Sequence, residues 1–449
     1  MSEGLKGQNR KIELKPKTQL LLIILCWAVY TVAYFGRYSY TSNVGPIQQY
    51  YGVGKEEFAL ATTFFFFAYG AGQLINGILC RRYNMRFMIF GSLAISSIIN
   101  AAVFFGLPFT YIKYVWLVNG LCQSILWASL IRILSCYLDV KHMKTAVIFM
   151  STTVSVGTLI IYGASALFAL FDGFKYSFLL ATICMGIISV IWFIYFPIFT
   201  KKARLENAPV QKGNDNADAD SEVRDNADGN VSETASDNSK SKNVFLNAFF
   251  WIVTLFSLFA ILTNYTKDGL TTWIPQILKE QYSLTDSLSI ILTLVLPLFG
   301  IFGALLAVFF NKFVKNFTDI LGIFFTLAAL SVLGIVLLFK TDYWYFVLIL
   351  FGLINMFMHG ANNVITSMFP LSVGGKHNAG LLAGVLNGAC YIGSTLSQYL
   401  IAMIASAGGW GSVMNVLLYF CIGMSAFAFI LFTIRQTVAR KKLGSFDKR

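Results

Sequence analysis

The sequence YTVAYFGRYSY, residues 30–40, lies inside the first long apolar segment of the chain. Arg37 follows Tyr30 and Tyr34 at helical spacing, so the three side chains share one face of a helix. An arginine in the middle of a membrane costs about 2.5–3.5 kcal/mol even on the lower, insertion-based scales. We therefore expect Arg37 to face a wet cavity and to meet an anion there. The alternative is an arginine near a helix end that extends to the membrane surface.

The rest of the chain is a series of similar apolar segments. Of the 449 residues, 57% are hydrophobic and 12% are charged, whereas an average soluble domain has about 25% charged residues. A helix needs about 20 apolar residues to cross a bilayer. The sequence therefore predicts an all-α membrane protein with twelve transmembrane helices. The predicted spans are 19–46, 57–79, 87–106, 110–137, 143–170, 176–199, 244–276, 286–311, 316–340, 342–371, 379–406 and 410–435.

A polar linker divides these spans into two sets of six. Residues 207–243 are rich in Asn, Asp, Ser and Ala and nearly lack apolar residues, so they are expected to be disordered. The predicted parts are a cytoplasmic N-terminal tail, a six-helix half, a cytoplasmic linker, a second six-helix half and a basic cytoplasmic tail. These parts are residues 1–18, 19–200, 201–243, 244–435 and 436–449.

The basic residues predict the orientation in the membrane. With both termini in the cytoplasm, the inner tails and loops hold twenty-two lysines and arginines, and the outer loops hold five: Lys55, Lys113, Lys175, Lys279 and Lys340. Cytoplasmic loops normally carry such an excess. We therefore expect a multi-pass protein of the cell membrane with both termini in the cytoplasm. The same distribution explains the net charge of +13 without a nucleic-acid partner.

A weak internal repeat relates the two halves. At an offset of 230 residues Arg37 corresponds to Lys267, and at 227 residues Arg132 corresponds to His359. Transporters of the major facilitator type consist of two such halves, with the substrate site between them at the membrane midplane.

The ionisable residues inside the spans are candidates for this site. Arg37 and Lys267 repel each other unless an anion lies between them, and a phosphate dianion suits this pair because arginine binds it with two hydrogen bonds. Asp268 is a candidate coupling group or a structural ion-pair partner of Lys267, although neighbouring residues point about 100° apart on a helix. Arg132 is a candidate ligand or a helix-packing residue. His359 is a candidate ligand, a proton relay or a satisfied polar residue.

Other residue types narrow the range of functions. Four tyrosines are candidate hydroxyl donors to the anion: Tyr30, Tyr34, Tyr69 and Tyr391. The seven cysteines show no paired spacing, so we expect neither a disulfide framework nor a metal site. The sequence shows no nucleophile–base set and no cofactor motif. We therefore expect a protein that is not an enzyme.

The chain resembles the organophosphate:phosphate antiporters of the major facilitator superfamily, which include glycerol-3-phosphate and hexose-phosphate transporters. Tyr30, Tyr34 and Arg37 match the family's first-span pattern of two tyrosines and a phosphate-binding arginine. Further matches are Tyr69-Gly70, Gln123, Trp127, Arg132, Gly269, Trp273, Gly380, Gly384 and Tyr391. The resemblance covers residues 20–435 apart from the linker. It implies a monomer that exchanges an organic phosphate for inorganic phosphate.

The sequence departs from this family at four positions, one of which is near Thr153, where the family has a span-5 histidine. The second phosphate-binding arginine falls on Lys267, which keeps the charge but lacks the planar fork. A span-2 lysine falls on Gln73, which is therefore a further candidate for substrate binding. Arg81 stands where the loop after span 2 normally has an aspartate. These departures leave substrate choice, coupling and the gating equilibrium open.

Three functions remain after this reasoning. The first is a secondary active transporter of an organic phosphate or related small anion by alternating access. The second is a membrane receptor for sugar phosphates, and the third is a carrier of another small solute coupled to protons through Asp268 or His359.

Overall fold

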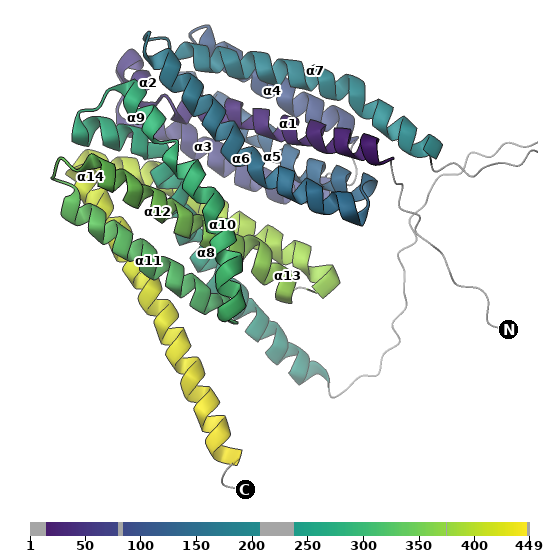
Figure 1. Cartoon of the computed structure of the whole chain (residues 1–449), viewed down its shortest axis with the longest axis vertical. Coiled ribbons are helices and arrows are strands. Elements are labelled where there is room, and N and C mark those ends of the chain that lie inside the picture. Colours follow the sequence, from purple (N-terminus) through teal and green to yellow (C-terminus); the bar gives the residue numbers. More distant parts are fainter. Residues whose placement is uncertain (1–14, 80–83, 207–237, 374, 447–449) are drawn as a thin grey trace, which may run out of the picture.

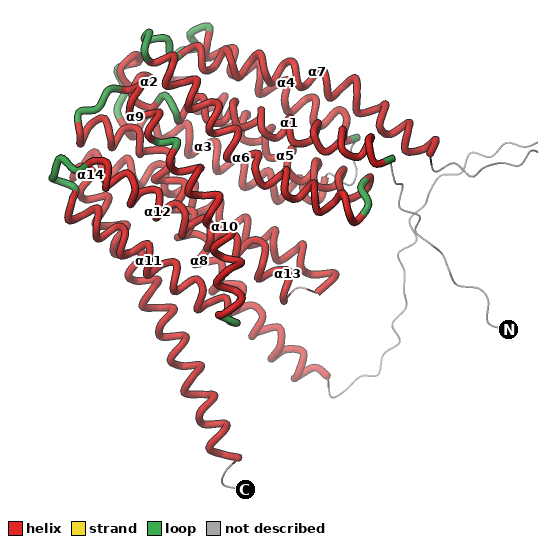
Figure 2. The backbone as a smooth tube through the Cα atoms, viewed as in Figure 1, coloured by secondary structure: helices red, strands yellow, loops and turns green. Residues whose placement is uncertain are grey.

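The computed structural model describes residues 15–79, 84–206, 238–373 and 375–446, and this part of the chain folds into helices joined by short turns (Figures 1 and 2). The N-terminal half contains α1 (Pro16–Thr41), α2 (Val44–Tyr51), α3 (Lys55–Leu79), α4 (Met85–Phe104), α5 (Phe109–Tyr137), α6 (Val140–Ala169) and α7 (Lys175–Glu206). The C-terminal half contains α8 (Asn238–Tyr282), α9 (Asp286–Leu292), α10 (Val295–Phe313), α11 (Phe317–Leu338), α12 (Trp344–Asn363), the π-helix η1 (Val364–Met368), α13 (Phe369–Val373) and α14 (Gly375–Phe446).

The predicted all-α membrane fold is confirmed. Eleven helical stretches of the described residues are long and apolar enough to cross a membrane, and the last stretch contains two spans. Helix α14 is interrupted at Gly409, where φ is 72° and ψ is 177°. Glycine adopts a positive φ easily because it has no Cβ, so the chain turns there and continues as a separate helix. This turn gives the twelfth span.

Several boundaries differ from the prediction. The first predicted span runs past the end of α1 into the first residues of the separate short helix α2, and the eighth covers α9 and most of α10. Helix occupies both margins of the predicted linker, because α7 continues to Glu206 and α8 begins at Asn238. The linker residues 207–237 and the tail residues 1–14 and 447–449 lie outside the described part of the chain.

Local sequence explains where some helices begin. Pro16 is the first residue of α1, where its fixed φ and missing N–H cost nothing. Asp139 caps α6 by accepting a hydrogen bond of 2.7 Å from the backbone N–H of His142. This bond and a second from the imidazole of His142 hold the pKa of the Asp139 carboxyl below its ordinary value.

The two halves meet along two sets of helices. Helix α3 packs against α14, while α6 packs against α9 and α10, and α2 contacts α8. We call the end of the bundle where α1 begins and α7 ends the linker end, and the opposite end, where α2 and α9 lie, the far end (Figure 1). Because successive spans run in opposite directions, this geometry fixes the end at which each loop lies.

Polar contacts join the halves at the far end. Lys55 Nζ lies 2.9 Å from Glu280 Oε2, and the same oxygen accepts a hydrogen bond of 2.7 Å from Trp410 Nε1. Gln276 Nε2 donates to Gln48 Oε1 across the halves at 2.6 Å. We call these five residues the far-end latch. They close the far end of the interface between the halves.

The outer surface of the bundle is apolar. Large hydrophobic side chains such as Phe67, Ile98, Leu330 and Phe429 are each at least 60% exposed. Water-soluble monomers rarely expose such surfaces over wide areas. The exposed apolar face is therefore suited to lipid hydrocarbon.

Candidate substrate-binding site

A polar cavity of about 250 Å³ lies between the two halves. Helices α1, α3 and α6 line it from the N-terminal half, and α8, α10, α12 and α14 line it from the C-terminal half. Its walls include six of the residues predicted from the sequence: Tyr34, Arg37, Lys267, Asp268, His359 and Tyr391. Ligand pockets for drug-sized molecules usually measure about 300–1,000 Å³, so this cavity suits a small solute.

Arg37 is a buried cation without a counter-charge in the described structure. Its side chain is 7% exposed, and Nε has no hydrogen-bond partner among the described residues. The guanidinium carbon lies 4.4 Å from the ring centroid of Tyr69, 4.8 Å from that of Tyr34 and 5.2 Å from that of Phe65. Such rings attract a desolvated cation by about 2 kcal/mol, which is less than the cost of burying it unpaired. Arg37 is therefore equipped to receive an anion from the cavity.

Tyrosines surround Arg37. The hydroxyls of Tyr30 and Tyr69 lie 3.3 Å apart, and the ring of Tyr69 lies 4.8 Å from that of Tyr391 across the halves. Gly70 permits this approach, because a Cβ there would lie 2.7 Å from the Cβ of Tyr391. Tyr34 and Tyr391 line the cavity itself. Tyr30 and Tyr69 do not line it, and the ring of Tyr69 packs against the guanidinium of Arg37.

Lys267 and Asp268 form an ion pair inside the cavity. Lys267 Nζ lies 3.4 Å from Asp268 Oδ1, and Asp268 Oδ2 accepts a hydrogen bond of 2.5 Å from Ser394 Oγ. Charge-assisted bonds between nitrogen and oxygen usually measure about 2.7–2.9 Å, so the ion pair is loose, as expected for neighbours on a helix. Together with Arg37, these side chains give the cavity wall a formal charge of +1.

His359 has a defined hydrogen-bonding pattern. Its Nδ1 lies 3.1 Å from the carbonyl oxygen of Asn355, and a carbonyl can only accept, so Nδ1 carries the proton. In the neutral ring Nε2 is then an acceptor. The ring packs against α10 at Gly300, where a Cβ would lie 3.2 Å from it.

Three other residues singled out from the sequence do not line the cavity. Gln73 accepts a hydrogen bond from Asn387, a cavity residue of the other half. Arg132 lies towards the linker end of α5 and is not part of the described cavity wall; its carbonyl oxygen accepts a bond of 2.8 Å from Ser135. Arg81 lies outside the described residues.

The sequence analysis missed a group of cavity asparagines. Asn264 on α8, Asn355 and Asn362 on α12 and Asn387 on α14 all belong to the C-terminal half. Asn355, His359 and Asn362 follow one another at i, i+4 and i+7, which places them on one face of α12. This spacing of polar residues within an apolar span is the signal that would have found them.

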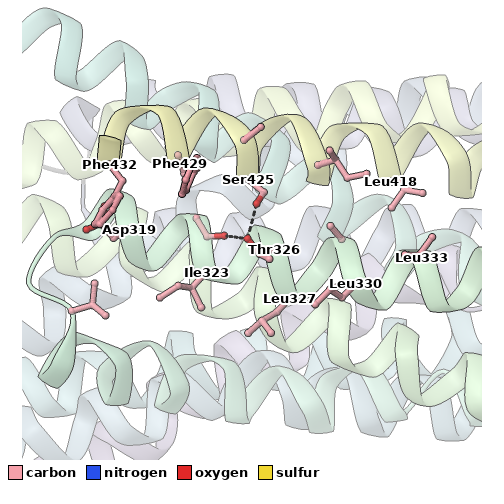
Figure 3. Close-up of a pocket in the computed structure, with 16 residues that line it drawn as sticks. Asp319, Ile323, Thr326, Leu327, Leu330, Leu333, Leu418, Ser425, Phe429 and Phe432 are labelled. Atoms are coloured by element: carbon pink, nitrogen blue, oxygen red, sulfur yellow. Dashed lines mark hydrogen bonds between the residues drawn. The ribbon is translucent and has the colours of Figure 1, made fainter. Parts of the chain in front are cut away.

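A larger hollow of about 850 Å³ lies outside the bundle, between α11 and the part of α14 that follows Gly409 (Figure 3). Its walls are apolar, and Leu330 and Phe429 in them are mostly exposed. Thr326 pairs with Ser425 in this groove at 2.6 Å, and the charge of Asp319 is balanced by Arg435, which contacts its Oδ2. This groove therefore suits lipid hydrocarbon and offers no free charge to a polar solute.

Comparison with known proteins identifies the class of the protein. The family model described as Major Facilitator Superfamily matches residues 26–398. The chain belongs to this family, and it is a membrane transporter and not an enzyme.

Similar proteins come from vertebrates. Sugar phosphate exchanger 3 of Gallus gallus is 24% identical over 412 residues, which cover 86% of this chain and 80% of that protein. Sugar phosphate exchanger 3 of Homo sapiens is 21% identical over 377 residues, which cover 78% of this chain and 74% of that protein.

Solved structures share the fold. A bacterial homologue of the human lysosomal transporter Spinster, in an inward-facing and unoccupied conformation, superposes with a TM-score of 0.67 at 15% identity over 93% of this chain and 97% of that one. The nucleoside transporter NupG superposes with a TM-score of 0.62 at 12% identity over 92% of this chain and all of that one.

Proposed function

We propose that this chain exchanges an organic phosphate for inorganic phosphate across a membrane by alternating access. Arg37 carries the proposal, because it is a buried arginine without a carboxylate partner among the described residues and it faces a polar cavity between the two halves. A bound anion would offset the cost of burying this charge, and a neutral solute would not. The names of the similar vertebrate proteins support the same substrate class.

The cavity residues suggest separate roles in phosphate binding. Arg37 supplies the forked guanidinium that fits two phosphate oxygens. Lys267 supplies a second positive charge, because its loose pairing with Asp268 leaves ammonium protons free for a ligand. Tyr34 and Tyr391 supply hydroxyl donors. A phosphate dianion bound there neutralises the positive excess of the cavity wall.

The closed far-end latch is consistent with alternating access. Because the halves are joined at the far end, we infer that a substrate enters and leaves from the linker side in this conformation. With both termini in the cytoplasm of a cell-membrane protein, as the basic loops suggest, this conformation faces inward. Opening the latch and closing the linker end would expose the same cavity outward. One chain contains both halves and suffices as a monomer.

Exchange in proteoliposomes tests this function. Vesicles containing the purified protein are loaded with labelled phosphate, and its efflux is followed after adding phosphate, glycerol-3-phosphate, glucose-6-phosphate, free glucose or a carboxylate outside. We expect efflux with phosphate and with a phosphate ester but not with free glucose. Saturable ester binding without any efflux would instead support the receptor. Flux driven by pH without phosphate would support the proton-coupled carrier.

A pair of arginine variants connects the flux to the site. Removing one partner of a buried charge pair costs about 2–5 kcal/mol, so Arg37→Gln should reduce exchange at least about 30-fold. Arg86→Gln is the matched control, because Arg86 donates to the carbonyl oxygen of Phe193 at 2.9 Å outside the cavity. Equal exchange by the two variants would refute the assignment of Arg37.

A further inference from the structure

The C-terminal half presents a polar face of α12 to the cavity, formed by Asn355, His359 and Asn362. We propose that this α12 face binds the hydroxyl groups of the organic part of the substrate and thereby selects a small polyol phosphate over other phosphate esters. This inference rests on the proposed function. It concerns the part of the cavity that the phosphate group does not occupy, and it makes that part the binding site for the organic group of the ester.

The α12 face has free hydrogen-bonding groups of both kinds. Asn355 Nδ2 donates to the carbonyl oxygen of Leu296 at 2.6 Å, but Asn355 Oδ1 has no partner among the described residues although the residue is 2% exposed. Asn362 Oδ1 accepts from Asn264 Nδ2 at 3.0 Å, which leaves the Nδ2 protons of Asn362 as donors without a described acceptor. His359 Nε2 is an acceptor in the neutral ring. Asn355 Oδ1 is itself buried, so one donor and one acceptor of this helix face, Asn362 Nδ2 and His359 Nε2, are open to the cavity.

This combination matches hydroxyl groups better than it matches a phosphate. A hydroxyl both donates and accepts, so neighbouring hydroxyls can satisfy the amide nitrogen of Asn362 and the imidazole acceptor of His359 together. A fully ionised phosphate only accepts, and the acceptor on His359 would repel it. The phosphate therefore belongs between Arg37 and Lys267, and the hydroxylated part belongs at the α12 face. The two ends of one ester then bridge the halves.

The cavity limits the size of the organic part. Its volume of about 250 Å³ has to hold the phosphate as well, and it lies below the range of about 300–1,000 Å³ that drug-sized ligands occupy. We therefore expect a single short polyol or one monosaccharide unit.

A structural role is the competing explanation for these asparagines. Asn264 and Asn362 tie α8 to α12, so their loss could loosen the packing of the C-terminal half. Such loosening would weaken the transport of every substrate. A hydroxyl-binding role weakens the transport of polyol esters and leaves inorganic phosphate unaffected, so the ratio between the two separates the explanations.

The test measures half-saturation concentrations in the exchange assay. External ligands are inorganic phosphate, glycerol-3-phosphate, glucose-6-phosphate and methyl phosphate, which has the ester but no hydroxyl. In the unaltered protein we expect at least one polyol ester to half-saturate at a lower concentration than methyl phosphate. In Asn362→Ala that advantage should shrink by about two- to tenfold, the value of one neutral hydrogen bond, when the half-saturation concentration of each ester is divided by that of inorganic phosphate in the same variant.

Matched variants complete the experiment. Asn363→Ala removes the neighbouring asparagine, whose Nδ2 lies 3.5 Å from the carbonyl oxygen of Ala304 outside the cavity, and it should leave all four ligands unchanged. Asn362→Ser serves if Asn362→Ala does not fold, and it should give the same change in the ratio. Equal weakening of all four ligands, or no advantage of either polyol ester in the unaltered protein, would overturn the inference. Absence of phosphate–phosphate exchange in the unaltered protein is a different result, which would overturn the proposed function and this inference with it.

Discussion

The ion pair between Lys55 and Glu280 should set how often the far end opens. The two side chains are 22% and 35% exposed, so the pair lies between a surface pair, worth about 0.2–1 kcal/mol, and a buried one. Breaking it should destabilise the closed far end by about 1 kcal/mol, since Glu280 keeps its hydrogen bonds from Trp410 and Gln276. The ratio of open to closed far end should then rise about fivefold in Lys55→Gln.

Distances between spin labels measure this ratio. Spin labels at positions 113 and 340 report on the far end, because both positions lie there. Position 113 belongs to the N-terminal half and position 340 to the C-terminal half, so the distance between the labels changes when the halves separate. Lys175→Gln is the matched control, since Lys175 donates at 2.7 Å to Tyr50 within its own half.

A double-mutant cycle then isolates the pair. Glu280→Gln alone should shift the ratio at least as far as Lys55→Gln, and the double variant should shift it less than the two single shifts combined. If Lys55→Gln and the Lys175→Gln control give the same distance distribution, or if the two single shifts add fully, the pair does not hold the far end closed.

Two further predictions concern stability. Gly70→Ala should lower the Tm of the purified protein, because the new Cβ would lie 2.7 Å from that of Tyr391 and overpacking costs about 1–3 kcal/mol. Gly91→Ala is the control, because a Cβ there would have no atom within 4 Å, and it should leave the Tm unchanged or raise it. Equal losses of Tm in the two variants would contradict the packing argument. The lowered pKa of Asp139 means that its carboxylate stabilises the fold above the ordinary pKa and loses this contribution as the pH falls through the lower folded-state pKa. Plots of Tm against pH should therefore fall less steeply at acid pH for Asp139→Asn than for the unaltered protein, and parallel curves would show that the bonds from His142 do not contribute.

Apolar segment lengths were sufficient to predict the twelve spans, because each span needs about 20 apolar residues whatever its neighbours are. They were insufficient at the far end. The first predicted span continued to residue 46, although α1 ends at Thr41, since the break at Ser42 and Asn43 contains no proline or glycine and Gly45-Pro46 follow only within α2. The number of apolar residues needed to cross a membrane therefore predicts the position of a span better than the position of the turn that follows it.

The candidate site shows the same division between local and tertiary information. Arg37 was conspicuous in the sequence because a charge is expensive in an apolar span. The asparagines of the cavity were not conspicuous, because burying an amide costs less free energy than burying a charge. A neighbouring helix also often provides a hydrogen-bond partner for such an amide. The partner of Lys55 was equally hidden, since only the packing of α3 against the C-terminal half brings it near Glu280.

We propose that the charge of the cavity favours exchange over net transport. When the cavity is empty, closing the linker end would enclose Arg37 with aromatic rings but without an anion, and an unpaired buried charge is strongly penalised. A bound phosphate removes this penalty, so the loaded protein changes conformation more readily than the empty one. The return step then needs a phosphate or phosphate ester from the other side. In this proposal the unpaired charge of Arg37 couples the two fluxes without a separate coupling ion.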